Sequence, residues 1–395
     1  MQHLRKALEI LKEMPPDRSR DSRELELQTA IGAVAFVSEG EGSADAGRAW
    51  ARAVELAITL DDVPRKALAL RLLGFNLVGR GELRRASEIS RDLYELSQQD
   101  RNPELEAKAN HLMGFVAFQT GEFRKSEQHM GAAAAQDPTR AGVRTRDHAL
   151  VSRGAALWYL GFPDQALALA REALMLGEDP DNPYQHTAVL QWAGTIHLLR
   201  GELALAEDLL RKSLNLCAER GFPIVGALNT VLMGLLAALR GQAQAGLEQI
   251  CRGSEILAAN SATIRQGPPY VLALGYALAG KPDEAFATLE EDLKWTERSG
   301  GEFWLASMHL LKGHLFQGRA NWEEAEKFFR TSIEIARRQS AKSLELRATT
   351  SLARLLAKQG KCEEARNMLS EIYGWFTEGA DTADLKNAKE LLEKL

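Results

Sequence analysis

The chain has 395 residues, of which 45% are hydrophobic and 26% charged, so it can bury a large core and is not disordered as a whole. Forty-nine Lys and Arg against 54 Asp and Glu give a net charge of −5, which lacks the basic excess of a nucleic-acid binder. Cys217, Cys251 and Cys362 form no Cys-x-x-Cys motif, so we expect reduced thiols in a cytoplasmic protein.

Residues 2–14 open the chain with a stretch that resembles the second helix of a helical hairpin. Charged residues run through it, and it lacks the apolar run of a secretory signal. Its first-helix partner would lie before Met1. We therefore predict that residues 1–23 are a leading half-repeat helix with its linker.

Small residues then recur along the chain at a constant spacing. A turn position, almost always glycine, returns every 39 or 40 residues, with a second small residue seven positions before it and a third five positions after it. Glycine at the turn supplies the positive φ with which a helix ends. Inside a helix it costs about 1 kcal/mol relative to alanine, so its repeated use there indicates that helix backbones approach closely. The turn positions are Gly81, Gly121, Gly161, Gly201, Gly241, Gly280, Ala320 and Gly360, with a degraded turn at Gly40 and Gly42 in front.

Apolar residues between these positions follow helical spacing, as in residues 67–78 and 304–316. Pro163 and Pro282 stand two residues after a turn position, where the first turn of a helix tolerates a missing N–H. No segment alternates polar and apolar residues as a half-buried strand does. The pattern predicts an all-α chain of helix–turn–helix units.

The spacing of small residues resembles the tetratricopeptide repeat (TPR), but with a period of about 40 residues where ~34 is usual. The resemblance implies a right-handed helical solenoid whose concave face is lined by the first helix of each unit. We expect about nine hairpins over residues 24–378 and a capping helix over residues 379–395, with Thr382 at its N-cap.

Two of the expected first helices, residues 221–239 and 266–280, carry no charged residue. The former is about as long as a membrane span, but it contains Pro223 and Asn229 and falls in register with the repeat, which favours a soluble helix. A helix that is apolar all round must be covered. Tight closure of the superhelix would bury it; alternatively, it forms a docking patch for a partner helix, a second copy of the chain or a small hydrophobic ligand. The residues assigned to this apolar docking patch are Val231, Leu235 and Leu274.

The TPR pattern also predicts which side chains face the concave groove. The middle units offer aromatic and hydrogen-bonding groups together, and two arginines end the groove with positive charge suited to a carboxylate. Each of these side chains has packing between units as its alternative. The predicted groove residues are Arg71, Phe75, Lys108, His111, Phe115, Gln119, Trp158, Gln191, Tyr270, His314, Arg347 and Arg354, with His148, Thr195 and Gln317 beside them.

The sequence contains no candidate catalytic, metal or cofactor site. Eight histidines are scattered, no His-Glu-x-x-His motif occurs, and His309 and His314 are five residues apart, which does not place them on one helix face. The Gly-rich run of residues 40–47 follows no strand and is interpreted as a turn between helices. We therefore expect a non-catalytic protein without a cofactor, which binds neither nucleic acid nor membrane.

Residues 3–32 and 341–395 resemble the opening and the end of the TPR tail in bacterial signalling proteins that combine an adenylate or guanylate cyclase domain with an AAA/STAND-type ATPase domain. The densest match covers residues 347–355 and 373–385. Since no Walker-type Gly-x-x-x-x-Gly-Lys-Ser/Thr is present, the resemblance implies a regulatory or sensor tail that binds a protein segment or ligand in its groove. A free-standing adaptor that binds peptides and a self-association module are the alternatives.

Overall fold

The computed structural model describes residues 1–135, 146–176, 182–260 and 268–395. Within these ranges the chain forms α-helices and no β-strand. The helices are α1 (Gln2–Lys12), α2 (Arg18–Glu39), α3 (Ala44–Thr59), α4 (Val63–Gly79), α5 (Leu83–Asp100), α6 (Pro103–Gln119), α7 (Phe123–Ala134), α8 (Arg146–Leu160), α9 (Pro163–Leu176), α10 (Pro183–Arg200), α11 (Leu203–Arg220), α12 (Pro223–Leu239), α13 (Ala243–Asn260), α14 (Pro268–Leu278), α15 (Pro282–Ser299), α16 (Leu305–Gly318), α17 (Trp322–Arg338), α18 (Lys342–Lys358), α19 (Cys362–Trp375) and α20 (Ala383–Lys394).

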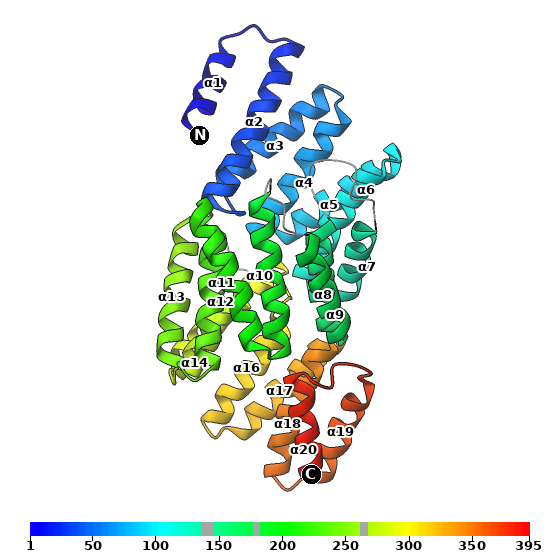
Figure 1. The fold of residues 1–395 in the computed structure, drawn as a ribbon, viewed down its shortest axis with the longest axis vertical. Coiled ribbons are helices and arrows are strands. Elements are labelled where there is room, and N and C mark those ends of the chain that lie inside the picture. Colours follow the sequence, from blue (N-terminus) through cyan, green and yellow to red (C-terminus); the bar gives the residue numbers. More distant parts are fainter. Residues whose placement is uncertain (136–145, 177–181, 261–267) are drawn as a thin grey trace.

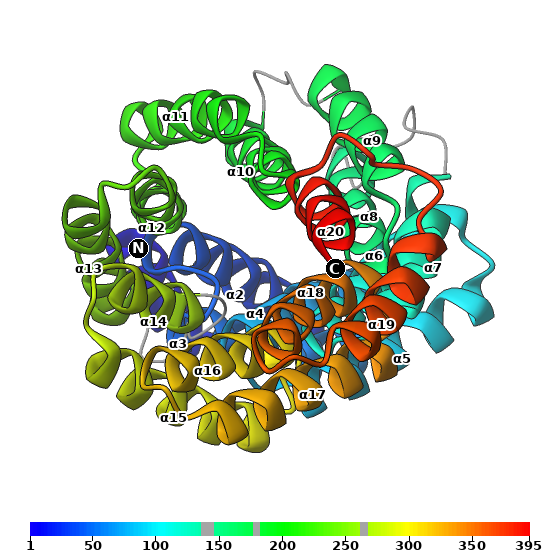
Figure 2. The same cartoon turned by 90° about the horizontal axis from the view of Figure 1, so that it is seen from below.

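Nine helical hairpins make up most of the described chain, from α2 paired with α3 to α18 paired with α19. α1 packs against α2, and α20 packs against α18 and α19. Figure 1 shows the chain running from the N-terminal end to the C-terminal end of an elongated molecule, and Figure 2 shows the hairpins arranged around a common axis. The expected all-α, TPR-like solenoid of about nine repeats is confirmed.

Each of the eight predicted turn positions adopts the left-handed backbone conformation. The φ angle is positive at all of them, from 56° at Ala320 to 94° at Gly161. Gly40, the degraded turn in front of the series, has a φ of 96°. In this region a Cβ atom crowds the following carbonyl oxygen, so Ala320 is strained in a conformation that glycine adopts freely.

Small residues inside the helices bring backbones into contact, as the sequence pattern predicts. A Cβ atom built on Gly234 of α12 would lie 2.6 Å from the carbonyl oxygen of Gly246 and 2.8 Å from the amide nitrogen of Ile250, both on α13. No side chain fits in that space. The close approach of the two helices therefore outweighs the helical cost of glycine at this position.

Prolines begin helices where the sequence places them, at Pro163 of α9 and Pro282 of α15. Thr382 occupies the N-cap position of α20, but its side chain does not cap the helix. Its hydroxyl donates to the carbonyl oxygen of Gly379 at 2.7 Å, because the backbone turns back at Gly379 with a φ of 77°. Thr382 is thus the N-cap residue of α20, as expected, although its side chain makes no capping hydrogen bond.

The superhelix brings its C-terminal units against the middle of the array (Figure 2). α18 packs against α8, and the hydroxyl of Ser343 donates to the carbonyl oxygen of Trp158 at 2.6 Å. In the same way, the amide of Phe303, just before α16, donates to the carbonyl oxygen of Gln119 on α6 at 3.2 Å. One turn of the superhelix therefore rests on the next, and hairpins that are five units apart contact each other.

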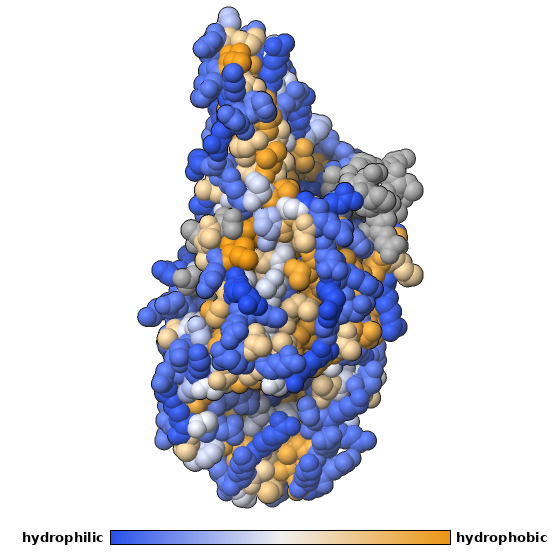
Figure 3. All heavy atoms as spheres, turned by 60° about the vertical axis from the view of Figure 1, so that its left-hand side comes forward, coloured by the Kyte–Doolittle hydropathy of each residue, from blue (hydrophilic) through white to orange (hydrophobic). Residues whose placement is uncertain are grey.

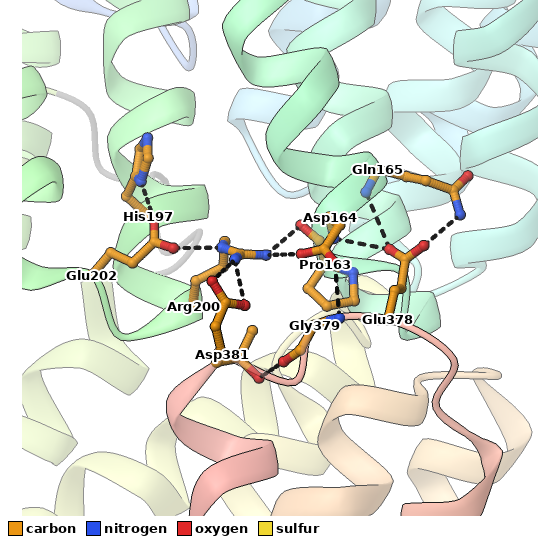
Figure 4. Close-up of polar contacts among 10 residues, drawn as sticks. Pro163, Asp164, Gln165, His197, Arg200, Glu202, Glu378, Gly379 and Asp381 are labelled. Carbon is orange, nitrogen blue, oxygen red and sulfur yellow. Dashed lines mark hydrogen bonds and ion pairs between the residues drawn. The ribbon is translucent and has the colours of Figure 1, made fainter.

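A buried arginine lies at the centre of this closure. The side chain of Arg200, 1% exposed, donates hydrogen bonds to Glu202 at 2.8 Å, to Asp164 at 2.9 Å and to Asp381 at 3.0 Å, as Figure 4 shows. Beside them, the carboxylate of Glu378 accepts a hydrogen bond from the backbone N–H of Asp164 at 2.8 Å. We call Arg200, Asp164, Glu202 and Asp381 the arginine clasp.

The stretch without charges, residues 223–239 of α12, is packed between α11, α13 and α14. Over the described ranges, no helix combines the length and the apolar character that a membrane crossing needs. Figure 3 shows one face of the molecule, where hydrophilic side chains predominate and apolar ones form a broken band from the N-terminal end toward the middle.

Candidate functional site

First helices of successive hairpins line a partly open cavity of ≈ 190 Å³. Its walls come from α6, α8, α10, α12 and α14, from the turn between α2 and α3, and from the segment that leads into α16. We call it the central cavity. Its lining residues are Glu41, Phe115, Gln119, His148, Tyr159, Tyr184, Ala188, Gln191, Trp192, Thr195, Ile224, Val225, Leu228, Val231, Leu232, Val271, Phe303 and Trp304.

Aromatic rings form much of the wall of the central cavity. The ring centroids of Tyr159 and Phe303 lie 5.4 Å apart, and those of Phe303 and Trp304 lie 4.3 Å apart. Tyr270, which does not itself line the cavity, stacks on Trp304 with centroids 4.8 Å apart. These contacts hold the rings in place. The faces of such rings carry partial negative charge and attract cations.

One carboxyl group lines the central cavity without a partner. The side chain of Glu41 makes no hydrogen bond or ion pair with any residue that the structure describes. Burial raises the pKa of Glu41 to about 7, because surroundings of low polarity disfavour the charged form. The group therefore exchanges its proton near neutral pH, and a cation placed beside it would favour the ionised form.

A buried row of basic side chains lies beside the cavity. Nη2 of Arg71 on α4 lies 3.5 Å from Nδ1 of His111 on α6, and Nε2 of His111 lies 2.7 Å from Nδ1 of His148 on α8. Burial and the charge of Arg71 lower the pKa of His148 to about 4, and burial with both neighbours lowers the pKa of His111 well below its usual value. Both imidazoles are therefore neutral at pH 7. We call these three residues the basic row.

Arg71 is the charged end of the basic row. Burial lowers the pKa of Arg71 to about 10, so the guanidinium stays protonated at neutral pH. It forms no ion pair with a carboxylate in the described ranges, and it lies 5.4 Å from the centroid of the Phe75 ring. His148, at the other end of the row, lines the central cavity. The row therefore leads from the cavity wall to a buried cation.

The structure brings several of the predicted groove residues together. Phe115, Gln119 and Gln191 line the central cavity, as do His148 and Thr195. Phe75 packs against the basic row, with its ring centroid 5.3 Å from that of His111 and 5.4 Å from that of Phe115. Arg71, Phe75, His111, Phe115, Gln119, Gln191 and, through Trp304, Tyr270 thus belong to one region of the molecule.

Other predicted groove residues have different surroundings. Lys108 pairs with Glu104 on its own helix. Trp158 is 1% exposed, and the guanidinium of Arg347 lies 4.7 Å from the centroid of its ring. Arg347 also pairs with Asp384 at 2.8 Å. Its charge is used in closing the superhelix and is not left for a ligand carboxylate.

A separate hollow near the C-terminal end contains His314 and Arg354, together with Gln317 and Ser351. The hydroxyl of Ser351 lies 3.2 Å from Nε2 of His314. None of these residues lines the central cavity. The predicted groove is thus divided between two hollows, because the closure of the superhelix interrupts the concave face.

Residues assigned to the apolar docking patch lie largely inside the array. Val231 is 2% and Leu235 7% exposed, and both belong to a hydrophobic cluster with Ile250. Leu274 packs against this cluster and against the next one along the chain. Within this set, Val231 lines the central cavity. The charge-free helices therefore contribute an inner wall.

Glu41 escaped the sequence analysis because its turn resembles an ordinary connection between helices. At the same position of other repeats, the glutamate after the turn glycine has a basic partner: Glu82 pairs with Arg80, and Glu122 pairs with Lys125. No basic residue stands two positions before or three positions after Glu41. A turn glutamate without its local base is the sequence signal that identifies this site.

No three His, Cys, Asp or Glu side chains come together to hold a metal ion in the ranges that the structure describes. The three cysteines are not joined in disulfides: Cys217 is buried, Cys251 is half-buried and Cys362 is exposed.

Comparisons with known proteins agree with the fold. Residues 304–374 match the tetratricopeptide repeat family, whereas comparison with curated proteins by sequence found no match. Among solved structures, that of a Rap protein complexed with competence and sporulation factor is similar, with a TM-score of 0.65 at 13% identity, covering 95% of this chain and 99% of that chain.

Two further structures share the architecture. The Rap conjugation gene regulator of plasmid pLS20 in complex with the Phr* peptide has a TM-score of 0.56 at 12% identity, covering 96% of this chain and 97% of that one. The Cut9–Hcn1 hetero-tetramer of the APC/C has a TM-score of 0.53 at 17% identity, covering 87% of this chain and 59% of that one. At such identities the likeness establishes a TPR-like helical solenoid, and the fold alone does not assign a function.

Proposed function

We propose that this protein is a non-catalytic interaction scaffold that binds a peptide or a protein segment in the central cavity and along the first helices around it. The observation that carries the proposal is the cavity itself, which the first helices of successive hairpins line. The carboxyl group of Glu41 and the buried indole N–H of Trp304, both among its lining residues, have no hydrogen-bond partner in the described chain. Buried polar groups without partners are destabilising, and a ligand that satisfies them gains affinity.

A peptide is a suitable occupant for physical reasons. A solenoid presents an extended inner surface, made by equivalent helices, along which an extended chain can make repeated contacts. The complex of a similarly folded regulator with the Phr* peptide supports this choice. The cavity supplies one recessed place for an anchoring side chain, and a few such buried contacts carry most of the binding energy in a typical interface.

Selection from a random heptapeptide library on the immobilised protein tests the proposal. Ala188 on α10 lines the cavity, so Ala188→Trp fills part of it without removing packing atoms. Ala204 on α11 is exposed, and Ala204→Trp is the matched control. Enriched peptides are expected to bind the wild type and Ala204→Trp equally and to bind Ala188→Trp at least tenfold more weakly. Failure to enrich any sequence, or equal binding to both variants, contradicts the proposal.

We further propose that the array serves as the regulatory tail of a signalling ATPase or cyclase, on the strength of the resemblance of residues 3–32 and 341–395 to such tails. The mass of the native polypeptide, measured by denaturing gel with an antibody against this region, tests the proposal. A band much larger than 43.5 kDa supports it. A band at 43.5 kDa contradicts it and favours a free-standing adaptor.

A further inference from the structure

If the central cavity binds a peptide, as proposed above, its walls also select the side chain that enters. We propose that the cavity recognises a protonated amine or guanidinium group on an apolar stem, such as a lysine or arginine side chain, with Glu41 as the counter-ion and aromatic rings as the walls. The inference rests on the proposed function in one respect, that the cation belongs to a bound peptide. The preference of the cavity for a cation can be tested without the peptide.

Glu41 supplies the first half of this recognition. Its carboxyl group lies in a cavity whose other acids and bases do not neutralise it, and the described chain leaves it without a hydrogen bond. An anion between such apolar walls gains more from a cation than it would in bulk water, because the surroundings screen the pair less than water does. A ligand cation therefore recovers free energy that the folded protein alone does not.

Aromatic side chains supply the second half. Tyr184, Trp192, Phe303 and Trp304 line the same cavity as Glu41. Burial, with the negative charge of Glu41 nearby, raises the pKa of the Tyr184 hydroxyl well above its usual value. Aromatic ring faces attract ammonium groups, and an anion in the same cavity adds to this attraction.

None of the charged and titratable groups described around Glu41 supplies a positive charge to its carboxylate. From α10, Tyr184 stays protonated; from α8, His148 is neutral at pH 7. From α4, Asn76 donates to the backbone carbonyl oxygens of Glu41 at 2.7 Å and Ser43 at 2.9 Å and does not reach the carboxyl group of Glu41. Arg80 is paired with Glu82, the glutamate after its own turn. The residues that α12 and α14 contribute to the wall are all apolar.

The volume of the cavity limits the ligand group. A cavity of about 150 Å³ holds a benzene molecule, and the central cavity has ≈ 190 Å³. It therefore admits one side chain or one small aromatic amine and excludes a folded partner. The peptide backbone would lie outside, along the first helices.

Three probes of nearly equal size test the inference: 2-phenylethylamine (cationic), 2-phenylethanol (neutral) and 3-phenylpropionate (anionic), each titrated calorimetrically into the full chain at pH 8. The amine is expected to bind at least tenfold more tightly than the alcohol, and the carboxylate most weakly. Between pH 6 and pH 8 the affinity for the amine should rise about tenfold as Glu41 ionises, while that for the alcohol stays constant.

Two variants decide whether Glu41 causes the preference. Glu41→Gln should bind the amine and the alcohol alike and lose the pH dependence. Glu122→Gln is the matched control. Glu122 occupies the same position two repeats later, but it is exposed and paired with Lys125, so this variant should bind the probes as the wild type does. Circular dichroism confirms that both variants fold.

The outcomes separate this inference from the proposed function. Equal binding of the three probes, tighter binding of the anion, or an undiminished preference in Glu41→Gln overturns the inference and leaves the peptide scaffold standing. Binding of none of the probes overturns it as well, while the peptide selection is judged separately. If selected peptides lose tenfold in affinity when their basic residue is replaced by glutamine, the cation that binds in the cavity comes from the peptide. If the peptides keep their affinity while 2-phenylethylamine still binds, the natural ligand of the cavity is a free amine.

Discussion

Arg200 and Asp381 are joined by two hydrogen bonds, of 3.0 and 3.1 Å, although 181 residues separate them in the chain. The arginine side chain is 1% exposed, whereas that of Asp381 is 67% exposed. The buried guanidinium also donates to the carbonyl oxygen of Pro163 at 2.8 Å. A charge is buried here because partners from two turns of the superhelix surround it.

Removing the central cation of the arginine clasp should open this contact. We expect Arg200→Ala to lower the free energy of unfolding by about 3 kcal/mol, because the variant removes a buried side chain, leaves a cavity and breaks the hydrogen bonds to Pro163 and Asp381. Asp381→Ala should cost only about 0.5–1 kcal/mol, since that carboxylate is largely solvated. Urea unfolding followed by circular dichroism measures both values, and small-angle X-ray scattering should show a larger radius of gyration for Arg200→Ala.

Lys212→Ala is the control for the clasp, because Lys212 forms an exposed pair with Asp208 on α11 and should change stability by less than about 0.5 kcal/mol. An Arg200→Ala protein with wild-type stability and scattering would show that hydrophobic contacts alone close the superhelix.

Glu41 should make the protein less stable as pH rises. Its pKa is about 7 in the folded state against a usual value of 4.5, so the folded state holds the proton more tightly than the unfolded state. The stability it contributes is fully present below pH 4.5 and is lost as pH rises through 7. Glu41→Gln should therefore be more stable than the wild type by about 1–3 kcal/mol at pH 8 and equal to it at pH 4.5. A constant difference between these pH values in urea unfolding would exclude a raised pKa.

His148 should act in the opposite direction. Its pKa is lowered from 6.5 to about 4, so its contribution to stability is present above pH 6.5 and is lost as pH falls toward 4. Between pH 6.5 and pH 4.5, we expect the free energy of unfolding of His148→Gln to fall by about 1–3 kcal/mol less than that of the wild type. His3→Gln changes an exposed histidine and should leave the pH profile unchanged. If both variants follow the wild-type profile, His148 is not buried in its neutral form.

Ala320 is a turn position where glycine should be better. Its φ of 56° strains an alanine, so Ala320→Gly should raise the free energy of unfolding by about 0.5–1 kcal/mol after the larger backbone entropy of glycine is subtracted. The reverse change tests the same physics at Gly360, where φ is 80° and a Cβ atom would contact nothing within 4 Å. Gly360→Ala should destabilise by about 1 kcal/mol. Denaturant unfolding measures both variants. If Ala320→Gly and Gly360→Ala change the free energy of unfolding in the same direction, strain at positive φ is not the cause.

Two glycines on α12 should respond in opposite ways to the same substitution. Gly234→Ala places a methyl group 2.6 Å from the carbonyl oxygen of Gly246, so it should cost about 3 kcal/mol or more through displacement of α13. At Gly226 the nearest atom to a new Cβ lies at 3.5 Å, an ordinary contact, and Gly226→Ala should stabilise by about 0.5–1 kcal/mol. Thermal melts of both variants measure the difference, and two equal shifts would contradict close packing at Gly234.

Local requirements made most of the fold predictable from sequence. A turn such as that at Gly241 needs positive φ, and a crossing such as that at Gly234 needs the absence of a side chain; both demands concern only a few neighbouring atoms. Small residues recur at these places along the chain, so their spacing predicts the number and order of the hairpins. The predicted groove residues do not all come together in the structure. Phe115 and Gln191 line the central cavity, whereas Arg347 closes the superhelix and Arg354 lies in another hollow.

The sequence by itself determined the period, the helices and the positions of their turns, because these follow from backbone sterics within one repeat. Only the tertiary structure decided that Arg200 meets Asp381 and that Glu41 lies in the cavity wall. Both facts depend on the small rotation from each hairpin to the next, summed over several units. A slight change in that rotation would move these side chains apart without altering any single hairpin.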